Sequence, residues 1–288
     1  MGKIEDLKSF ATLLFNIQKS DRDNTLGVAG ETGVGKSTFL TLLAFQYGIV
    51  AGNKWTFNNM TWDRAEMLEW IDGEKKSTPL KNGLKPGQLP EYSAIVLDEL
   101  FLLFYRRTWY DEGQIDSIST LNMCRDRHLL IGGAVPNFWD LDGAFTRRIR
   151  FYVYVFERGR AWIFEQDNNP FNVDPWNKNL NKKLFAKYKN PYGLPNYIAE
   201  ISFPDWTPKQ KAEYYSIRNV KRVLALQKSG GEKKEKYKNI KEQRDKVISF
   251  LFDYGKGYPG PAPLKLTNKL IGEVAGLSEE VIRLIRNT

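Results

Sequence analysis

Hydrophobic residues along this chain fall into short continuous runs, separated by stretches in which they recur at helical spacing. The continuous runs at Thr25–Ala29, Ala94–Asp98 and His128–Val135 predict buried strands. Helical spacing over 4–20 and the apolar run Phe39–Phe45 predict helices on either side of the first strand. Buried strands that alternate with helices predict a parallel sheet with helices on both faces.

Weaker patterns predict the elements between and after these strands. A second strand is expected over Trp55–Met60, and helices are expected over Asp63–Trp70 and Gln114–Arg127. Residues 72–91 are rich in Lys, Gly and Pro and predict a loop. Two apolar runs flank turn residues within 150–164 and predict a β-hairpin. Together these elements predict a main domain over residues 1–165.

The chain after this domain is predicted to be irregular over 166–206 and then helical and basic over 207–288. Thr207 is a candidate N-cap, Pro208 follows at the first helical position, and Gln210 lies three residues after the cap. These residues predict a helix to about Lys228. A second charged helix is expected over 232–254, followed by a linker rich in Gly and Pro.

The last segment, 267–287, is typical of a helix-turn-helix, with Thr267 and Ser278 as N-caps and a tight turn at Ala275–Leu277. The second helix of such a unit often enters the major groove of DNA. Here that helix begins Ser-Glu-Glu, which would bring two carboxylates toward the phosphates. The segment therefore predicts either a DNA-contacting domain or a helical lid or oligomerisation element.

The most informative motif lies between the first strand and the helix after it. The sequence GETGVGKST fits the pattern G-x-x-x-x-G-K-[ST], whose glycines let backbone N–H groups point at phosphate oxygens beside a helix N-terminus. Lys36 is expected to reach the β and γ phosphates, and the Ser37 hydroxyl is expected to hold Mg²⁺. The predicted nucleotide-binding residues are Gly30, Glu31, Thr32, Gly33, Val34, Gly35, Lys36, Ser37 and Thr38.

Two consecutive acids at the end of the strand Ala94–Asp98 complete the predicted site. Asp98 is expected to hold Mg²⁺ through water, and Glu99 is expected to orient and deprotonate an attacking water as general base. Such a tandem pair favours hydrolysis over transfer of a phosphoryl group to a metabolite. No N-K-x-D segment for guanine recognition occurs in the sequence, so ATP is the predicted nucleotide.

Over residues 20–156 the chain resembles P-loop ATPases of the additional-strand catalytic-glutamate group, which includes AAA+ and RecA-like ATPases and the FtsK/HerA type. The resemblance implies a parallel RecA/AAA+-like sheet with an extra strand between the two nucleotide motifs. It also implies that a polar residue at the end of that strand senses the γ-phosphate, and Asn137 matches this position.

The same resemblance implies an arginine finger that enters the site of a neighbouring subunit. Arginines follow the pair Leu141-Asp142, so Arg147, Arg148 and Arg150 are candidates, with a surface salt-bridge cluster as the alternative. Arg125 and Arg127 are rivals, because FtsK/HerA-type ATPases also place an arginine before this strand. The resemblance thus implies a homo-oligomer, with a hexamer expected.

Charge is unevenly distributed along the 288 residues, whose formal net charge is +9. Residues 1–150 carry 18 Lys and Arg against 19 Asp and Glu, whereas residues 151–288 carry 25 against 15. A cationic half attracts nucleic acid or another anionic surface, although a solvated lysine-rich helical face would look the same. The distribution therefore favours DNA as a partner without requiring it.

Other features of the composition narrow the class of protein. No uncharged apolar run of about 18 residues predicts a membrane span, and the charged N-terminus lacks the apolar stretch of a signal peptide. The single cysteine, Cys124, cannot form an internal disulfide, and one histidine leaves too few ligands for a zinc site. A cytoplasmic location and Mg²⁺ as the only metal are expected.

These observations favour an ATP-hydrolysing motor or remodeller that acts on nucleic acid and forms a ring, of the kind used in DNA packaging, mobilisation or replication by viruses or plasmids. An ATP-dependent switch or loader on DNA, of the transposition or partition type, is the alternative. A small-molecule kinase is disfavoured by the tandem acids and the basic C-terminal half.

Overall fold

Helices cover both faces of the central sheet, which explains why three of its inner strands are buried at every position. The structure is a computed structural model that describes residues 4–22, 24–74, 77–108, 111–169 and 173–224. The chain divides into the units Met1–Val223 and Leu224–Thr288. The helix predicted over 232–254 and the helix-turn-helix predicted over 267–287 lie outside the described residues.

The fold is mixed α/β, with a seven-stranded, mostly parallel sheet in the order β2-β3-β4-β1-β5-β6-β7. Strands β1 to β5 pair in parallel, and β6 and β7 extend the sheet by antiparallel pairing. The strands are β1 (Asn24–Ala29), β2 (Met60–Thr61), β3 (Ala94–Asp98), β4 (Leu130–Val135), β5 (Phe151–Glu157), β6 (Arg160–Glu165) and β7 (Tyr197–Ser202). The predicted fold class is confirmed.

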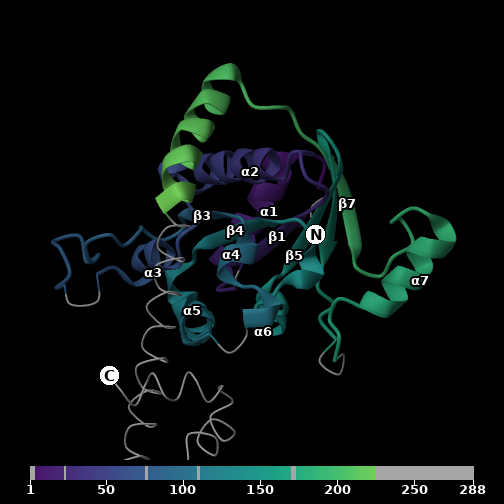
Figure 1. Cartoon of the computed structure of the whole chain (residues 1–288), viewed down its shortest axis with the longest axis horizontal. Helices are drawn as coiled ribbons and strands as arrows, with labels where there is room; N and C mark the ends of the chain where they lie inside the picture. Colours follow the sequence, from purple (N-terminus) through teal and green to yellow (C-terminus); the bar gives the residue numbers. More distant parts are fainter. Residues whose placement is uncertain (1–3, 23, 75–76, 109–110, 170–172, 225–288) are drawn as a thin grey trace, which may run out of the picture. The chain divides into compact units, whose positions relative to one another are not determined.

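The helices form a layer on each face of the sheet (Figure 1). One layer contains α1 (Leu7–Lys19) and α2 (Lys36–Ala51), which pack against each other. The other contains α3 (Arg64–Asp72), α4 (Leu100–Leu103), α5 (Glu112–Met123) and α6 (Gly143–Arg148). Because side chains of a strand alternate between faces, Val96 faces Leu40 of α2 while its neighbour Leu97 joins the core beneath α3 and α4.

The strand order places β4 between β1 and β3. The register aligns Ala29 with Val135 and Asp98 with Ala134, so these three parallel strands end at one edge of the sheet. The loop after β1, the acids at the end of β3 and the turn after β4 therefore meet at that edge. This arrangement agrees with the extra strand that the family resemblance implies between the two nucleotide motifs.

The strand predicted over Trp55–Met60 is largely wrong. Phe57–Asn59 form a 3₁₀ turn, and only Met60–Thr61 pair with β3. The aromatic side chains that suggested a strand pack instead as a cluster: Trp55 and Phe57 contact each other and Phe45 of α2 edge to face. Burial of these rings, rather than pairing in the sheet, accounts for the apolar pattern.

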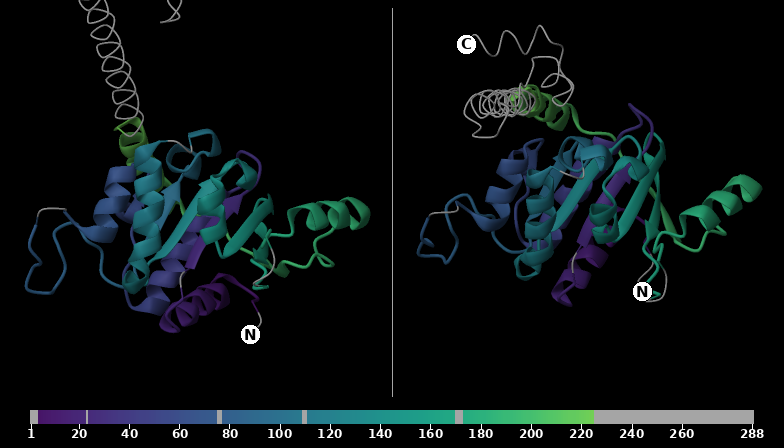
Figure 2. Two further views of the ribbon diagram at one scale, coloured as in Figure 1. Left: turned by 90° about the horizontal axis from the view of Figure 1, so that it is seen from below. Right: turned by 60° about the horizontal axis from the view of Figure 1, so that its bottom comes forward.

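The expectation that 166–206 is irregular is also corrected, because this stretch contains α7 (Lys178–Tyr188) and β7. In both views of Figure 2, α7 stands out from the sheet. No residue of α7 is buried, and its few apolar side chains, such as Leu184 and Phe185, form only a short face among lysines and asparagines. Strand β7 is held by antiparallel pairing with β6 at the edge of the sheet.

The helix predicted after Thr207 begins at residue 208 and continues to 224, the end of the described chain (bright green in Figure 1). The predicted cap forms: the backbone N–H of Gln210 donates to Thr207 Oγ1, and the backbone N–H of Thr207 donates to Gln210 Oε1. This helix, called helix 208–224 below, is part of the same unit as the sheet up to Val223.

Candidate active site

The phosphate loop lies where β1 passes into α2, at the carboxyl edge of the sheet. Gly30 has a φ of 149°, and a Cβ there would lie 2.3 Å from the carbonyl oxygen of Val155, so only glycine fits without movement. Gly35 caps α2 with a φ of 104°. The 16-residue α2 thus presents its positive N-terminus to the loop, which is the geometry that binds phosphate.

The Lys36 side chain folds back over the loop. Its Nζ donates to the carbonyl oxygens of Gly30 and Glu31 at 2.9 and 2.8 Å. Partial burial lowers the pKa of Lys36, although the negative charges of Glu99 and Asp98 oppose that shift. The ammonium group is therefore held in the space that the loop encloses, between the main chain and the two acids.

Ser37 and Asp98 meet directly, although 61 positions separate them in the chain. Ser37 Oγ donates to Asp98 Oδ1 at 2.6 Å, and Asp98 is only 4% exposed. A hydroxyl and a carboxylate oxygen are hard donors of the kind that Mg²⁺ prefers. The residues present therefore fit the predicted metal, which Ser37 and Asp98 would hold beside the phosphates.

Glu99 has an unusual backbone conformation, with φ 95° and ψ 60°. Left-handed geometry is unfavourable for a residue with a Cβ and is found where surrounding structure forces it, often at functional sites. Glu99 directly follows the buried end of β3 and is the N-cap of α4, whose Leu100 and Leu103 are buried. Anchored on both sides, Glu99 keeps its carboxylate partly exposed next to Asp98.

The predicted sensor, Asn137, lies at the same edge of the sheet, two residues after β4. It is exposed, and its side chain accepts a hydrogen bond from the Trp139 amide. The structure thus brings the phosphate loop, Asp98 and Glu99 together. Asn137 follows β4, the strand that lies between β1 and β3.

The candidate finger arginines lie at and after the end of α6 and differ in their partners. Arg150 donates twice to Glu165 Oε1, at 3.1 and 2.8 Å, so its guanidinium is bound within its own chain. Arg148 donates to Asn122 at 3.0 Å. Arg147 is exposed, and within the described chain its guanidinium forms no hydrogen bond or ion pair. Of the three, Arg147 is the one whose guanidinium is exposed and makes no such contact within the described chain.

The rival arginines precede β4, in the 3₁₀ turn Cys124–Arg127. Arg125 is exposed, whereas Arg127 is half-buried and donates to the carbonyl oxygen of Leu89. The Leu89 contact fixes Arg127 against the loop that precedes β3.

Sequence reasoning missed the side chains that helix 208–224 brings to the two acids. Tyr214 Oη donates to Asp98 Oδ2 at 2.6 Å, and Arg222 Nη2 lies 3.9 Å from Glu99 Oε1. Burial, together with the charge and hydrogen bond of Asp98, raises the pKa of Tyr214, so its hydroxyl stays protonated at neutral pH. Positions 214, 218 and 222 share one helical face, a spacing of four that is the only signal in the sequence.

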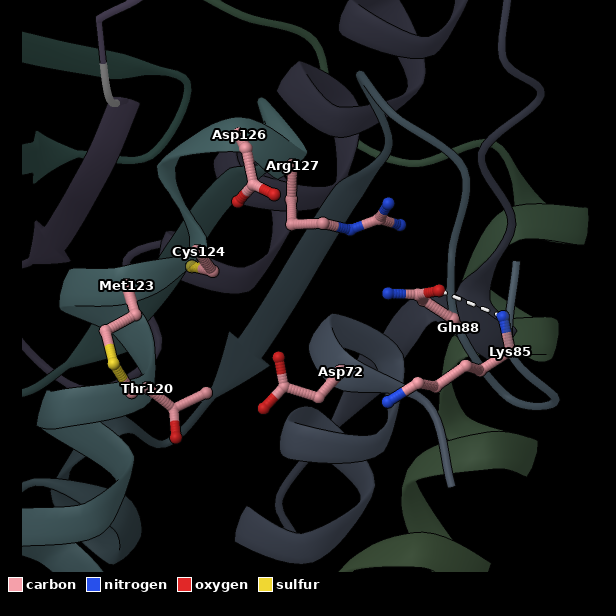
Figure 3. A pocket seen from close by; sticks show the side chains of 8 residues that line it. All are labelled: Asp72, Lys85, Gln88, Thr120, Met123, Cys124, Asp126 and Arg127. Atoms are coloured by element: carbon pink, nitrogen blue, oxygen red, sulfur yellow. Dashed lines mark hydrogen bonds between the residues drawn. The ribbon is translucent and has the colours of Figure 1, made fainter. Parts of the chain in front are cut away.

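A hollow of about 350 Å³ lies apart from the phosphate loop, between the end of α3, the loop before β3 and the end of α5 (Figure 3). Its charged side chains balance, with two acids and two bases, and the described residues hold no group of three or more His, Cys, Asp or Glu placed to bind a metal. Its lining consists of Asp72, Lys85, Gln88, Thr120, Met123, Cys124, Asp126 and Arg127. The hollow therefore offers neither an excess of charge nor a metal site among the described residues.

Neither a scan with family models nor a search of curated proteins found a match. Solved structures similar to the chain include C. elegans PCH-2 (14% identity, TM-score 0.37, 53% of this chain and 42% of that one) and the FIGL-1 AAA domain (17%, 0.35, 53% and 51%). The N-terminal domain of zonular occludens toxin from Neisseria meningitidis aligns over 66% of this chain and 98% of that one (14%, 0.36).

The aligned region spans about half the length of the PCH-2 and FIGL-1 structures. Structural similarity at these TM-scores does not establish a function, which depends on the geometry of this chain's own residues. Within the described part of the chain, no helix has the length and apolar character needed to cross a membrane.

Proposed function

We propose that this protein is an ATP-hydrolysing motor or remodeller that acts on DNA and works as a homo-oligomeric ring, of the FtsK/HerA type found in viruses and plasmids. The observation that carries the ATPase proposal is the 2.6 Å hydrogen bond between Ser37 and Asp98 beside a phosphate loop at a helix N-terminus. It joins two motifs that are far apart in sequence at the place where a nucleotide's phosphates would bind.

Each residue of the site has a proposed role in hydrolysis. The loop N–H groups and Lys36 bind the β and γ phosphates and neutralise charge as the bond between the γ phosphorus and its bridging oxygen breaks. Glu99 accepts a proton from the water whose oxygen bonds to the γ phosphorus, and ADP leaves with the bridging oxygen's electron pair. Mg²⁺, when bound at Ser37 and Asp98, supplies positive charge to the phosphates.

Two further residues complete the proposed site. We assign Asn137, which follows β4, to sensing the γ-phosphate, and Arg147, with Arg148 as the second candidate, to the finger that enters the next subunit. Because the finger comes from another subunit, turnover would require assembly, and a hexameric ring is the proposed form.

DNA is proposed as the partner because of charge. Besides the cationic half of the sequence, the described chain carries five lysines at 178, 182, 183, 187 and 189 and no acid between 175 and 199. The four within α7 follow one side of that exposed helix, which a polyanion could contact. A cytoplasmic location is part of the proposal, because ATP is available there and the lone cysteine needs no oxidising compartment.

The proposal is tested by measuring the ATPase rate with duplex DNA, single-stranded DNA, RNA and no nucleic acid. We expect DNA to raise turnover and to bind with an affinity that falls steeply with salt. Lys36→Ala should abolish nucleotide binding, and Glu99→Gln should bind ATP but slow hydrolysis by about 10²-fold or more. The exposed Glu91→Gln serves as the matched control and should leave the rate unchanged.

The ATPase, DNA-partner and motor parts of the proposal would each be rejected by a different result. Turnover that persists in Lys36→Ala and Glu99→Gln would exclude this site as the ATPase. A rate and an affinity that DNA leaves unchanged would exclude DNA as the partner while leaving the ATPase in place. DNA-dependent but very slow turnover without movement along DNA would favour the switch or loader over the motor.

A further inference from the structure

Helix 208–224 closes over the metal end of the proposed ATPase site. Tyr214 is 3% exposed and Asp98 is 4% exposed, so each buries the other. Asp98 receives a hydrogen bond on each carboxylate oxygen, from Ser37 on Oδ1 and from Tyr214 on Oδ2, both at 2.6 Å. In this arrangement little of the carboxylate is open to water.

The segment leading into the helix is anchored to α2 by aromatic contacts. Phe203 packs edge to face against Phe39, with ring centroids 5.2 Å apart. Trp206 Nε1 donates to Thr41 Oγ1 at 2.8 Å, and its ring lies 4.4 Å from that of Tyr214. The start of the helix is therefore tied to the first turns of the helix that follows the phosphate loop.

The far end of the described helix makes ionic contacts around the same site. Lys221 Nζ donates to Glu66 Oε1 at 2.7 Å and to the carbonyl oxygens of Asn58 and Met60. Arg222 reaches toward Glu99, the proposed base, at 3.9 Å. Both acids of the site thus face side chains of one helix, and that helix leads directly into the part of the chain that follows residue 224.

A carboxylate that holds Mg²⁺ through water needs room for that water, since Mg²⁺ keeps several waters when it binds protein. Tyr214 fills the space at Asp98 Oδ2 in this structure. Tyr214 and a hydrated cation therefore compete for the same carboxylate, and two ligands that compete are coupled in free energy.

We propose that helix 208–224 is a nucleotide-responsive clasp, in which Tyr214 holds Asp98 while the site lacks nucleotide and releases it when Mg²⁺-nucleotide binds. This inference rests on the proposed ATPase function. Release of Tyr214 would loosen the start of the helix, where Tyr214 packs against Trp206. Tyr214 acts on the site through Asp98 and is not itself a catalytic residue.

The first test measures the affinity for Mg²⁺-ADP by calorimetry in the full chain and in Tyr214→Phe. Removing the competing hydroxyl should tighten binding by about 3- to 10-fold, because the lost hydrogen bond to a charged group no longer opposes it. The matched control is Tyr215→Phe, the same change at the neighbouring tyrosine, which is 42% exposed and should bind as the unchanged protein does.

The second test measures the mobility of the helix rather than the affinity for nucleotide. Amide hydrogen exchange of residues 203–218 should become at least several-fold faster on adding Mg²⁺-ADP, and it should respond much less in Tyr214→Phe. Weaker binding in Tyr214→Phe would mean that Tyr214 supports the metal site and would overturn the clasp. Unchanged affinity together with unchanged exchange would also overturn it.

Failure of the clasp and failure of the ATPase proposal are distinguishable by Lys36→Ala. If calorimetry finds no binding in any variant, or binding that survives Lys36→Ala, the proposed nucleotide site itself is wrong. If binding depends on Lys36 but Tyr214→Phe changes neither affinity nor exchange, the nucleotide site stands and the clasp alone is rejected.

Discussion

At the scale of single residues, the phosphate loop depends on close approach of main chain to main chain. Gly30 and Gly33 both have positive φ, 149° and 87°. A Cβ added at Gly30 would lie 2.3 Å from Val155 O, whereas a Cβ added at Gly33 would have no atom within 4 Å. Gly30→Ala should therefore displace β5 or the loop as well as strain the backbone. We expect it to lower the free energy of unfolding by about 2 kcal/mol or more.

Thermal unfolding measures the loss of stability expected for Gly30→Ala. Gly33→Ala is the control, because it adds only the left-handed strain of about 1 kcal/mol and should lower Tm by roughly half as much or less. Equal losses of Tm in the two variants would show that the contact with Val155 does not constrain the loop.

Glu99 combines a proposed chemical role with an unfavourable backbone, and the two effects are separable. Glu99→Ala removes the carboxylate but keeps a Cβ at φ 95°, whereas Glu99→Gly removes both. We expect both variants to lose hydrolysis and the glycine variant to be more stable than the alanine variant by about 1 kcal/mol. Melting curves of the pair measure this, and an alanine variant as stable as the glycine variant would mean that the position is unstrained.

At the scale of elements, burial on both faces decides which parts of the fold could be predicted. Strands β1, β3 and β4 lie inside the sheet, every position is buried, and their continuous apolar runs identified them. Strand β7 is an edge strand with a charged Glu200, and α7 has no buried residue, so each has only a weak local hydrophobic signal. These two elements depend on pairing and contacts that sequence periodicity does not encode.

The candidate site likewise contains residues that the sequence predicts and residues that it does not. The phosphate-loop residues and the tandem acids were predictable because phosphate and metal chemistry dictates residue types at fixed spacing. Tyr214 was not, because its bond to Asp98 joins positions 116 residues apart and uses no motif. Its role depends on where helix 208–224 packs.

Helix α7 allows a prediction about DNA binding by one element. Its lysines lie on one side, while Leu184 and Phe185 turn toward the sheet, Phe185 packing against Trp162. The combined change of Lys182, Lys183 and Lys187 to Gln should weaken DNA binding by about 10-fold or more at moderate salt and make the salt dependence shallower, because fewer counterions are released. Fluorescence anisotropy over a range of salt concentrations measures both quantities.

A second triple variant separates a specific surface from net charge. Lys8, Lys19 and Lys81 are exposed on other elements of the chain, and changing all three to Gln removes the same total charge. We expect this variant to keep most of the affinity. A loss equal to that of the α7 variant would show that DNA responds to overall charge and not to this helix.

At the scale of the whole molecule, the site as folded lacks one part that the proposed chemistry uses. Within the described chain, the arginine that approaches the two acids is Arg222, which pairs with Glu99 at 3.9 Å, while Arg147 is exposed on α6. An arginine that is exposed on its own subunit is accessible to the site of another copy. If it does so, two inactive variants should restore each other when mixed.

The prediction uses Glu99→Gln and Arg147→Ala subunits, each expected to be nearly inactive alone. In an equimolar ring assembled at random, about a quarter of the sites join an intact Glu99 to a neighbour's intact Arg147 and should hydrolyse ATP. Mixing Glu99→Gln with Lys36→Ala subunits is the control, because one chain supplies both residues to its own site. Every subunit of that mixture carries one of the two lesions, so no site is intact. Activity restored in the first mixture and absent in the second therefore assigns Arg147 to the neighbouring site, whereas two inactive mixtures would place every essential group within one chain.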